Sequence, residues 1–337
     1  MTHVTVSRAF SGKDPVAPAT RRRIMEAARN LGYRPNTAAK AVRTGRTGFV
    51  GMLRSREPWC SVLDSRFEVG VDDALHDRGL CLVRDVLAES SALSGRQAVP
   101  RVVGEHLVDG LLVNYAFGTP EPVRELLDRC RVPAIWINCK RPENCVRPND
   151  EGAAGDATRH LLEHGHRRIV FADHADPIHP GMELHYSVLD RRNGYAQAMR
   201  QAGLAPQFFA IPPFPDAFHR LGHIRKVFMD WLGRADRPTA VVCGIGGGGR
   251  TLLLAAARLG LRVPEDLSVI TFDNDAGADE HVEVDRVLVP AGAMGRVAVS
   301  ELCALMDKPA VPRRAVVIPF EFHCTGTVAR PNLRDGS

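Results

Sequence analysis

A run of glycines is the part of this sequence whose residue types most suggest chemistry. Residues 243–251 read CGIGGGGRT and stand between an apolar strand-like run and a helical segment. Gly244, Gly246 and Gly249 fit G-x-G-x-x-G, in which bare backbone approaches a dinucleotide pyrophosphate at a helix N-terminus. In the related pattern G-x-x-x-x-G-K-[ST], Arg250 stands in the place of the lysine, and these two side chains are not interchangeable there. A nucleotide-phosphate-binding enzyme is therefore an interpretation that this run leaves open.

A second pattern, H-x-x-E-H at residues 160–164, would place two imidazoles one helical turn apart, as zinc enzymes do. The following residues indicate a helix end instead, because Gly165 is a typical C-terminal cap and the cationic residues after it favour the negative end of the dipole. A zinc site also needs a third ligand, which the sequence does not identify. No G-x-S-x-G or other nucleophile motif occurs either. We therefore predict no catalytic residue, no metal and no cofactor.

The composition is that of a folded globular protein. The 337 residues are 45% hydrophobic and 25% charged, which suits about two domains. No apolar run approaches the roughly 20 residues that cross a bilayer, and the N-terminus lacks the apolar core of a secretory signal. We expect a cytoplasmic protein without membrane contact. The eight cysteines include no C-x-x-C pair, so we expect reduced thiols.

The charge is concentrated at the N-terminus. Residues 1–47 carry ten Lys or Arg against Asp14 and Glu26, a net charge of +8, whereas the whole chain has +5. The remaining 290 residues are therefore mildly acidic, at −3. A small basic module on an acidic body is typical of a protein that binds a polyanion, most often nucleic acid.

The hydrophobic pattern changes at residue 48. Before it, residues 20–31 have one apolar helical face and end at a glycine, and short helices flank this segment on both sides. After it, β-branched apolar runs such as 49–54, 132–138 and 267–273 alternate with helical segments. Such alternation predicts parallel sheets covered by helices on both faces. The runs before and after Asn149 fit two sheets, and a cleft between them is the default ligand site.

Several short motifs, taken together and in order, resemble the lactose/galactose repressor family of bacterial transcription regulators. In the basic module these are T-V-S-R at 5–8, S-G at 11–12, T-R-R-R-I at 20–24, L-G-Y-R-P-N at 31–36 and G-R-T at 45–47. In the body they are N-D-E-G-A-A at 149–154, H-L-L-E-H-G-H-R-R-I at 160–169, R-x-x-G-Y at 191–195, R-P-T-A-V at 237–241, G-L-R-V-P-E-D-L-S-V-I at 260–270 and F-D at 272–273. The resemblance spans nearly the whole chain.

The resemblance implies an α/β fold: a two-lobed, periplasmic-binding-protein-like core of two parallel sheets flanked by helices, after a partial all-α helix-turn-helix head. The head would occupy residues 1–47, with a hinge helix at about 36–45 and with the family's first helix absent. The core would occupy residues 48–330. Its N-lobe would comprise about 48–148 and 286–318, and its C-lobe about 149–285 and 319–330.

By the same resemblance, the chain is a ligand-responsive transcriptional regulator, a repressor that acts as a homodimer on a two-fold symmetric DNA operator. The DNA-binding residues implied in this way are His3, Val4, Thr5, Ser7, Arg8, Asn36 and Val42. Arg8 suits a bidentate contact to guanine, and Val42 would enter the minor groove where the family usually inserts leucine. Ala17 stands where a serine usually caps the following helix, and losing such a cap costs about 1 kcal/mol.

The implied effector is a small metabolite, a carbohydrate, held between the lobes. Arg191 and Asp273 match family ligand positions and would orient a polyol by charge-assisted hydrogen bonds, although they could instead pair with each other. The further candidates are Trp136, Tyr186, Phe214 and Ile245. At Ile245 and Gly246 the family often has Asn-Asp, so one partner for a sugar hydroxyl is missing. A cytoplasmic sugar-binding protein without DNA function is the alternative from another class.

Overall fold

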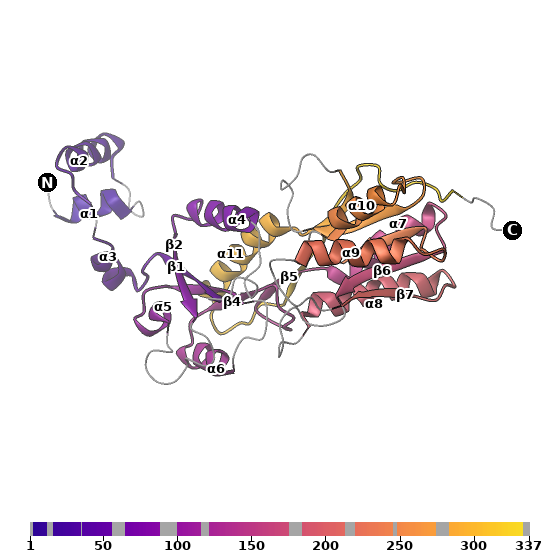
Figure 1. Cartoon of the computed structure of the whole chain (residues 1–337). Helices are drawn as coiled ribbons and strands as arrows, with labels where there is room; N and C mark the ends of the chain where they lie inside the picture. The colour runs from indigo at the N-terminus through magenta and orange to yellow at the C-terminus, as the bar shows by residue number, and fades with distance from the viewer. Residues whose placement is uncertain are drawn as a thin grey trace.

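The computed structural model describes residues 3–11, 16–34, 36–55, 65–87, 100–115, 121–174, 184–212, 220–244, 248–273 and 283–332. A small helical head lies at one end of the molecule, and two α/β lobes follow it (Figure 1). The expected fold class is confirmed, because each lobe contains a mainly parallel sheet with helices on both faces.

The described residues of the head form three helices, α1 (His3–Ser11), α2 (Pro18–Asn30) and α3 (Thr37–Thr44). Helix α2 matches the helix expected at 20–31, and α3 falls within the stretch expected for the hinge. The small core of the head includes Ala9 and Ile24, which are 1% and 5% exposed. Ala17 stands at the N-cap of α2 and makes no side-chain capping bond, as expected. The basic residues of α2 are therefore left on its outer side, where Arg21, Arg22 and Arg23 are exposed.

The first lobe, called the N lobe here, is built on a six-stranded parallel sheet. In spatial order its strands are β11 (Val316–Ile318), β5 (Cys145–Pro148), β4 (Ala134–Ile137), β3 (Gly110–Asn114), β1 (Phe49–Ser55) and β2 (Cys81–Leu87). Helices α4 (Ser65–His76) and α11 (Ala291–Asp307) pack on one face, and α5 (Arg101–Gly104) and α6 (Glu121–Cys130) on the other. Successive residues of β1 show the strand period, because Met52 enters one core and Leu53 the other.

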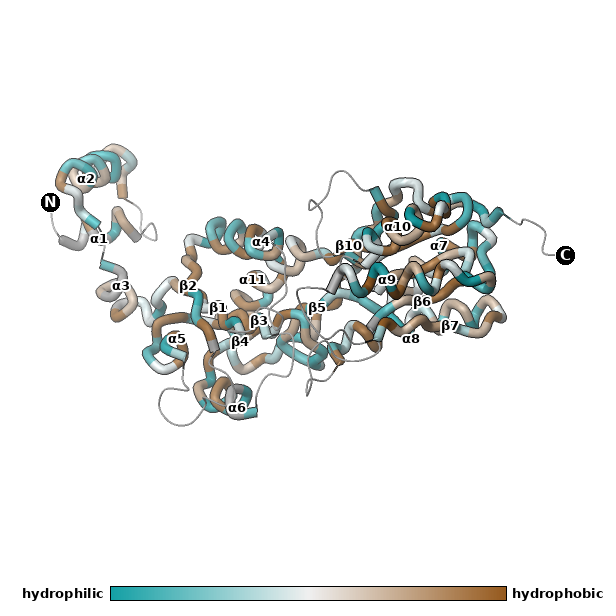
Figure 2. Tube along the Cα trace, viewed as in Figure 1, coloured by the Kyte–Doolittle hydropathy of each residue, from teal (hydrophilic) through white to brown (hydrophobic). Residues whose placement is uncertain are grey.

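The second lobe, called the C lobe here, repeats this plan. In spatial order its strands are β12 (Glu321–His323), β10 (Asp285–Leu288), β9 (Ser268–Asp273), β8 (Ala240–Cys243), β6 (Ile169–His174) and β7 (Gln207–Ile211). Helices α7 (Asp150–Glu163) and α8 (Tyr186–Gln201) cover one face, and α9 (Arg220–Leu232) and α10 (Gly248–Arg258) the other. The strand pairs are parallel except β10 with β12. In Figure 2, hydrophobic residues lie along the central strands of both lobes.

Among the described residues, three crossings join the lobes. The chain passes from one sheet to the other after Pro148, after Leu288 and after Ile318. Strand β10 belongs to the second sheet, so the middle crossing falls later than the boundary expected at 285/286. The backbone N–H of Asn149 donates to the carbonyl of Ile318 at 2.8 Å and ties two of the crossings together. These two crossings therefore lie side by side.

The end of the hinge stretch is fastened to the N lobe by a carboxylate. Asp109, just before β3, accepts hydrogen bonds from the Thr47 N–H at 2.7 Å, the Thr47 hydroxyl at 2.9 Å and the Gly48 N–H at 2.8 Å. Arg46 pairs with Asp307 at the end of α11, at 2.9 Å. The residues that follow α3 are thus fixed to the N lobe.

Candidate functional site

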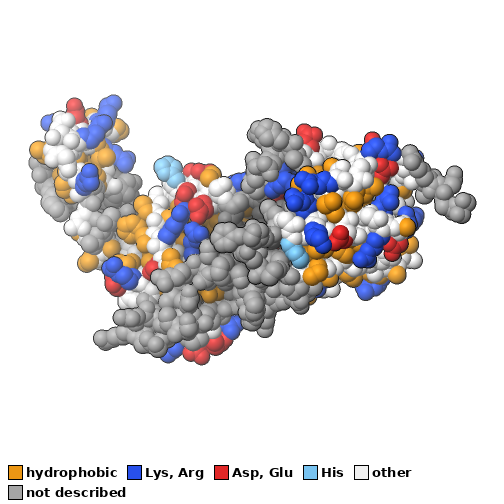
Figure 3. All heavy atoms as spheres, viewed as in Figure 1, with side chains coloured by type: hydrophobic (Ala, Val, Ile, Leu, Met, Phe, Trp, Pro, Cys, Tyr) orange, Lys and Arg blue, Asp and Glu red, His pale blue; other side chains and the backbone are white. Residues whose placement is uncertain are grey.

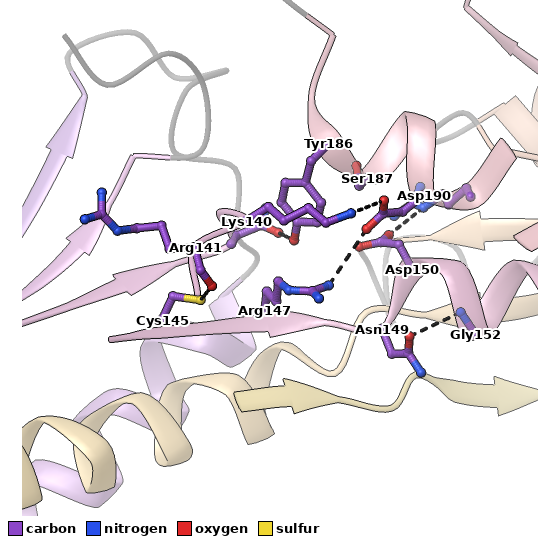
Figure 4. A network of polar contacts seen from close by, with 12 residues as sticks. Lys140, Arg141, Cys145, Arg147, Asn149, Asp150, Gly152, Tyr186, Ser187 and Asp190 are labelled. Atoms are coloured by element: carbon purple, nitrogen blue, oxygen red, sulfur yellow. Dashed lines mark hydrogen bonds and ion pairs between the residues drawn. The ribbon is translucent and has the colours of Figure 1, made fainter. Parts of the chain in front are cut away.

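Charged side chains gather between the lobes at one edge of the C-lobe sheet. Asp173, Gly244 and Asp273 stand at or just after the carboxyl ends of β6, β8 and β9. In open parallel sheets this edge is where ligands bind, because the loops that leave it can diverge around a crevice. The first turn of α7 and the second turn of α8 bring further charged residues to the same edge (Figure 4).

Arg191 of α8 forms the most buried ion pair of this edge. Its Nε lies 2.7 Å from Oδ1 of Asp150, the first residue of α7, and its Nη1 donates to the carbonyl of Gly244 at 3.3 Å. The guanidinium also lies 4.2 Å from the ring centre of Phe272. The Arg191 side chain is 14% exposed and that of Asp150 is fully buried. Arg191 is therefore held rigidly, with its charge turned toward the cleft edge.

The second carboxylate oxygen of Asp150 has an unusual environment. Oδ2 is buried and has no hydrogen-bond partner among the described residues. Burial raises the pKa of Asp150 above its ordinary value, although the Arg191 charge and hydrogen bond act in the opposite direction. A buried acceptor without a partner is costly, and such groups commonly pair with a ligand or water. Asp150 therefore carries, beside the Arg191 guanidinium, a buried acceptor oxygen that the described contacts leave unused.

A carboxylate of the C lobe joins two cations of the N lobe (Figure 4). Asp190 accepts a hydrogen bond from Lys140 at 2.6 Å and lies 3.8 Å from Arg147 of β5. The Asp190 side chain is 5% exposed and that of Arg147 is 19% exposed, whereas Lys140 is half exposed at 53%. The two lobes are thus linked electrostatically across the crevice.

Neutral hydrogen bonds add to this link at the start of α8. The Tyr186 hydroxyl donates to Oδ1 of Asn138 at 2.9 Å, and His185 Nε2 lies 3.1 Å from the Asn138 carbonyl oxygen. His185 is also the N-cap of α8, where its Nδ1 accepts from the Ser187 N–H. Nε2 must then carry the proton that is donated to Asn138. Burial lowers the pKa of His185 to about 4, so the ring is neutral at pH 7.

Two further arginine–aspartate pairs complete the edge. Arg192 holds Asp173 through two bonds of 2.7 and 2.8 Å, and burial raises the pKa of Asp173 despite this partner. Arg250, from the glycine run, lies 3.4 Å from Asp273. The described contacts thus pair Asp273 with Arg250 and Arg191 with Asp150, rather than Arg191 with Asp273.

The glycine run follows β8 and opens α10, as expected, but packing explains one of its glycines. A Cβ on Gly249 would lie 2.4 Å from Cβ of Thr271 on β9, so only glycine lets α10 approach the sheet this closely. Arg250, in the place of the phosphate-binding lysine, already has a carboxylate partner in Asp273. Residues 245–247 lie outside the described residues.

The other candidates for ligand contact are distributed unevenly. Tyr186 lies in the cleft network described above. Trp136, on β4, is 5% exposed and belongs to the N-lobe core, with the Arg141 guanidinium 4.5 Å from its ring centre. Phe214 and Ile245 lie outside the described residues. The structure therefore places Arg191 and Tyr186 among the polar contacts between the lobes, Asp273 at the strand ends of the C lobe, and Trp136 in the N-lobe core.

The candidates for DNA contact lie on the head. His3, Val4, Thr5, Ser7 and Arg8 belong to α1, and Arg8 is exposed. Oδ1 of Asn36 accepts from the Ala39 N–H at 3.2 Å, so Asn36 caps α3. Val42, on α3, is 89% exposed, which is unusual for an apolar side chain. Figure 3 shows Lys and Arg side chains gathered on the head. The head thus presents positive charge together with an uncovered valine.

Sequence reasoning missed most of the cleft network. Asp150 lies inside the N-D-E-G motif, but its value as a ligand group follows from burial and from the approach of Arg191, 41 positions later. Asn138, Lys140 and Asp190 carry no motif at all. Their roles arise because the two lobes meet, which no local pattern encodes. No helix among the described residues is both long enough and apolar enough to span a membrane.

Comparison with known proteins gives matches along the chain. The family description "Bacterial regulatory proteins, lacI family" matches residues 2–36, and "Periplasmic binding protein-like domain" matches residues 158–325. The HTH-type transcriptional regulator CelR of Thermobifida fusca is 30% identical over 302 residues, which cover 87% of this chain and 84% of CelR.

Two solved structures have the same fold. The Lac repressor dimer bound to operator and the anti-inducer ONPF superposes with a TM-score of 0.74 at 20% identity, over 98% of this chain and 96% of that chain. A CelR–cellobiose complex superposes with a TM-score of 0.62 at 24% identity, over 97% of this chain and 96% of that chain.

Proposed function

Since this chain belongs to the LacI family of bacterial transcriptional regulators, we propose that a carbohydrate effector binds between its lobes and controls the affinity of its head for operator DNA. The observation that carries the proposal is the buried, unpartnered Oδ2 of Asp150 beside the fixed Arg191. The relatives are regulators rather than enzymes, so this cleft is a binding site and not a catalytic one.

The chemistry of the cleft favours a polyol. A sugar hydroxyl both donates and accepts, so one hydroxyl can donate to Asp150 while another accepts from Arg191. Phe320 is half-buried, lies 5.8 Å from the Arg191 guanidinium and supplies apolar surface beside these charges, whereas Phe272, 4.2 Å away, supports the guanidinium from the core. The CelR–cellobiose complex supports a carbohydrate as the ligand class. Trp136, Phe214 and Ile245 remain predictions as contact residues, and Asp273 would act through the guanidinium of Arg250.

The head supports binding to operator DNA. We assign base contacts to His3, Val4 and Arg8 and insertion into the minor groove to Val42, because Arg8 and Val42 are exposed. Thr5, Ser7 and Asn36 would position phosphates. The arginines of α2 contribute attraction to the backbone that does not depend on sequence.

A two-fold symmetric operator requires two copies of the head, and we propose that the chain acts as a homodimer in the cytoplasm. Val69 on α4 and Val86 on the edge strand β2 are 57% and 51% exposed. Both lie on the N lobe, next to the head, where a second copy would bring two heads together. Light scattering in solution should give twice the mass of the 36.9 kDa chain.

The coupling between effector and operator follows from two sets of contacts. Ligand between the lobes must alter the contacts of Asp190 with Lys140 and Arg147, because these bridge the same crevice. The resulting movement of the N lobe reaches the hinge through Asp109 and Gly48. Coupling of this kind is reciprocal, so operator binding changes effector affinity by the same factor.

The test begins with a thermal-shift screen of mono- and disaccharides, with nucleosides as a competing ligand class. A ligand that binds the native state raises the melting temperature by mass action. The best sugar is then titrated by calorimetry against the wild type, Asp150→Asn and the matched variant Asp156→Asn, whose carboxylate is exposed. We expect at least a tenfold loss of affinity for Asp150→Asn and no change for Asp156→Asn.

Two results would overturn the proposal. If the protein binds a nucleoside but no sugar, the proposed carbohydrate effector is wrong. If all three proteins bind the sugar with equal affinity, the proposed binding site at Asp150 is wrong. A mobility-shift assay with the DNA that flanks the chain's own gene tests the proposed binding of the head to operator DNA. Sugar binding without retention of any of this DNA would favour a sugar-binding protein without DNA function.

A further inference from the structure

Three potential metal ligands meet on the C lobe, away from the cleft pairs described above. His160 lies on α7, Asp285 begins β10, and Cys324 directly follows β12. One ligand atom from each lies within 4.8 Å of the other two. The H-x-x-E-H pattern lacked a third ligand in the sequence, and the fold supplies an aspartate and a cysteine from 125 or more positions away beside its first histidine.

The carboxylate of this cluster is rigidly positioned. Asp285 is 2% exposed, and its Oδ1 accepts backbone hydrogen bonds from Thr325 at 2.6 Å, Gly326 at 2.8 Å and Thr327 at 3.1 Å. These donors fix the turn that carries Cys324. Carboxylates that bind metals in proteins are commonly oriented by such outer hydrogen bonds.

The imidazole of this cluster is held by packing and is open to a ligand. The ring centre of His160 lies 4.5 Å from that of His164 and 5.2 Å from that of Phe322. Neither ring nitrogen of His160 makes a hydrogen bond to another residue in the described ranges. His160 also lines a pocket of about 390 Å³ with Arg159, Phe320 and Phe322. Solvent ions can therefore reach the ring.

We propose that His160, Asp285 and Cys324 bind a zinc ion. Imidazole, carboxylate and thiolate are the three ligand types that zinc takes in proteins, and three protein ligands leave one position of a tetrahedron open. Ligand atoms on one zinc lie about 3.5 Å apart, given bond lengths of about 2.0 to 2.3 Å. Rotation of the Cys324 and His160 side chains closes the difference from 4.8 Å, because Cys324 is exposed and His160 is half-buried.

The metal would fasten the last crossing of the chain to α7. Strand β12 follows the crossing after Ile318 and pairs with β10 through three residues. A zinc ion shared by α7, β10 and the residue after β12 adds a link that this short strand lacks. The zinc-bound state is therefore more stable, and the unfolding temperature of the C lobe rises with zinc concentration.

The test uses the full chain and metal alone. Cobalt(II) chloride is titrated into reduced protein. An absorption band of a cobalt–thiolate bond in the near ultraviolet then reports directly that a cysteine binds the metal. Equilibrium dialysis against zinc chloride then gives stoichiometry and affinity for the wild type, Cys324→Ser, His160→Gln and the matched variant Cys81→Ser, whose thiol is also exposed.

We expect one metal ion per chain with a thiolate band in the wild type and in Cys81→Ser. Cys324→Ser should lose this band, and both ligand variants should bind zinc at least about tenfold more weakly, which is the lower end of the loss seen for outer hydrogen-bond partners. Circular dichroism without metal verifies that each variant is folded. Equal affinity of wild type and Cys324→Ser, or a wild type without the thiolate band, would overturn the proposal. The Asp285 carboxylate is left intact because its loss would release the turn itself.

Discussion

Replacing Arg191 with methionine is the sharpest perturbation of the cleft, because it removes the cation beside a fully buried carboxylate. Arg191→Met leaves Asp150 without its 2.7 Å partner and keeps an apolar chain of similar length over Phe272. Removing one partner of a buried ion pair costs about 3–5 kcal/mol. We expect a loss of about 3 kcal/mol, the lower end, because 14% of the Arg191 side chain is exposed.

The pH dependence of this loss has a definite sign. Burial raises the pKa of Asp150, and removal of the arginine raises it further. When the pKa of a carboxyl group is higher in the folded state than its unfolded value of about 3.9, the fold loses stability as the pH rises from the unfolded pKa to the folded pKa. The difference in stability between variant and wild type should therefore be larger at pH 7 than at pH 5.

Urea unfolding followed by tryptophan fluorescence measures this difference. Arg159→Met is the matched control, since Arg159 pairs with Asp156 on the exposed side of α7, and such pairs contribute at most about 1 kcal/mol. The double variant Asp150→Asn/Arg191→Met should recover stability relative to Arg191→Met at pH 7. A loss below about 1 kcal/mol, or a loss that is larger at pH 5 than at pH 7, would contradict a stabilising role of Arg191 beside Asp150.

Four further predictions concern the head, the hinge and the cleft. Ala17→Ser should supply the missing cap of α2 and slow hydrogen exchange in that helix by the equivalent of about 1 kcal/mol. Val42→Leu should tighten binding to a symmetric operator and Val42→Ala should weaken it, as measured by fluorescence anisotropy. Asp109→Asn should weaken the bonds to the residues after α3 and reduce the effect of sugar on operator affinity, with sugar affinity retained. In urea unfolding, the wild type should lose up to about 3 kcal/mol of stability between pH 6.5 and 4, because the folded His185 ring resists protonation until about pH 4. His185→Gln should not show this loss.

Local patterns predict the elements of this fold well. The amphipathic period of residues 20–31 and the apolar runs around Trp136 and Phe272 correspond to α2, β4 and β9. Alternation of strands and helices indicates parallel sheets, since parallel strands need crossover connections. These features depend on residues a few positions apart, so the sequence contains them directly.

The cleft could be predicted in part. Arg191 and Tyr186 make polar contacts near the junction of the lobes, and their contact with a ligand stays a prediction, whereas Asp150 and Asp190 acquire their roles from partners on other elements. Burial also decides what a side chain can do, as Trp136 illustrates. Its type suits stacking on a sugar, yet it is 5% exposed inside the N-lobe core. The partners of a charged group depend on tertiary contacts that no spacing rule specifies.

Operator affinity measured with and without the best sugar shows whether ligand between the lobes controls the head. The measurement uses fluorescence anisotropy on the wild type and on Asp150→Asn, at sugar concentrations that saturate the wild type. We predict that sugar changes the operator affinity of the wild type at least tenfold and leaves that of Asp150→Asn nearly unchanged. An equal response of both proteins, or no response of the wild type to a sugar that it binds, would contradict control of the head from this cleft.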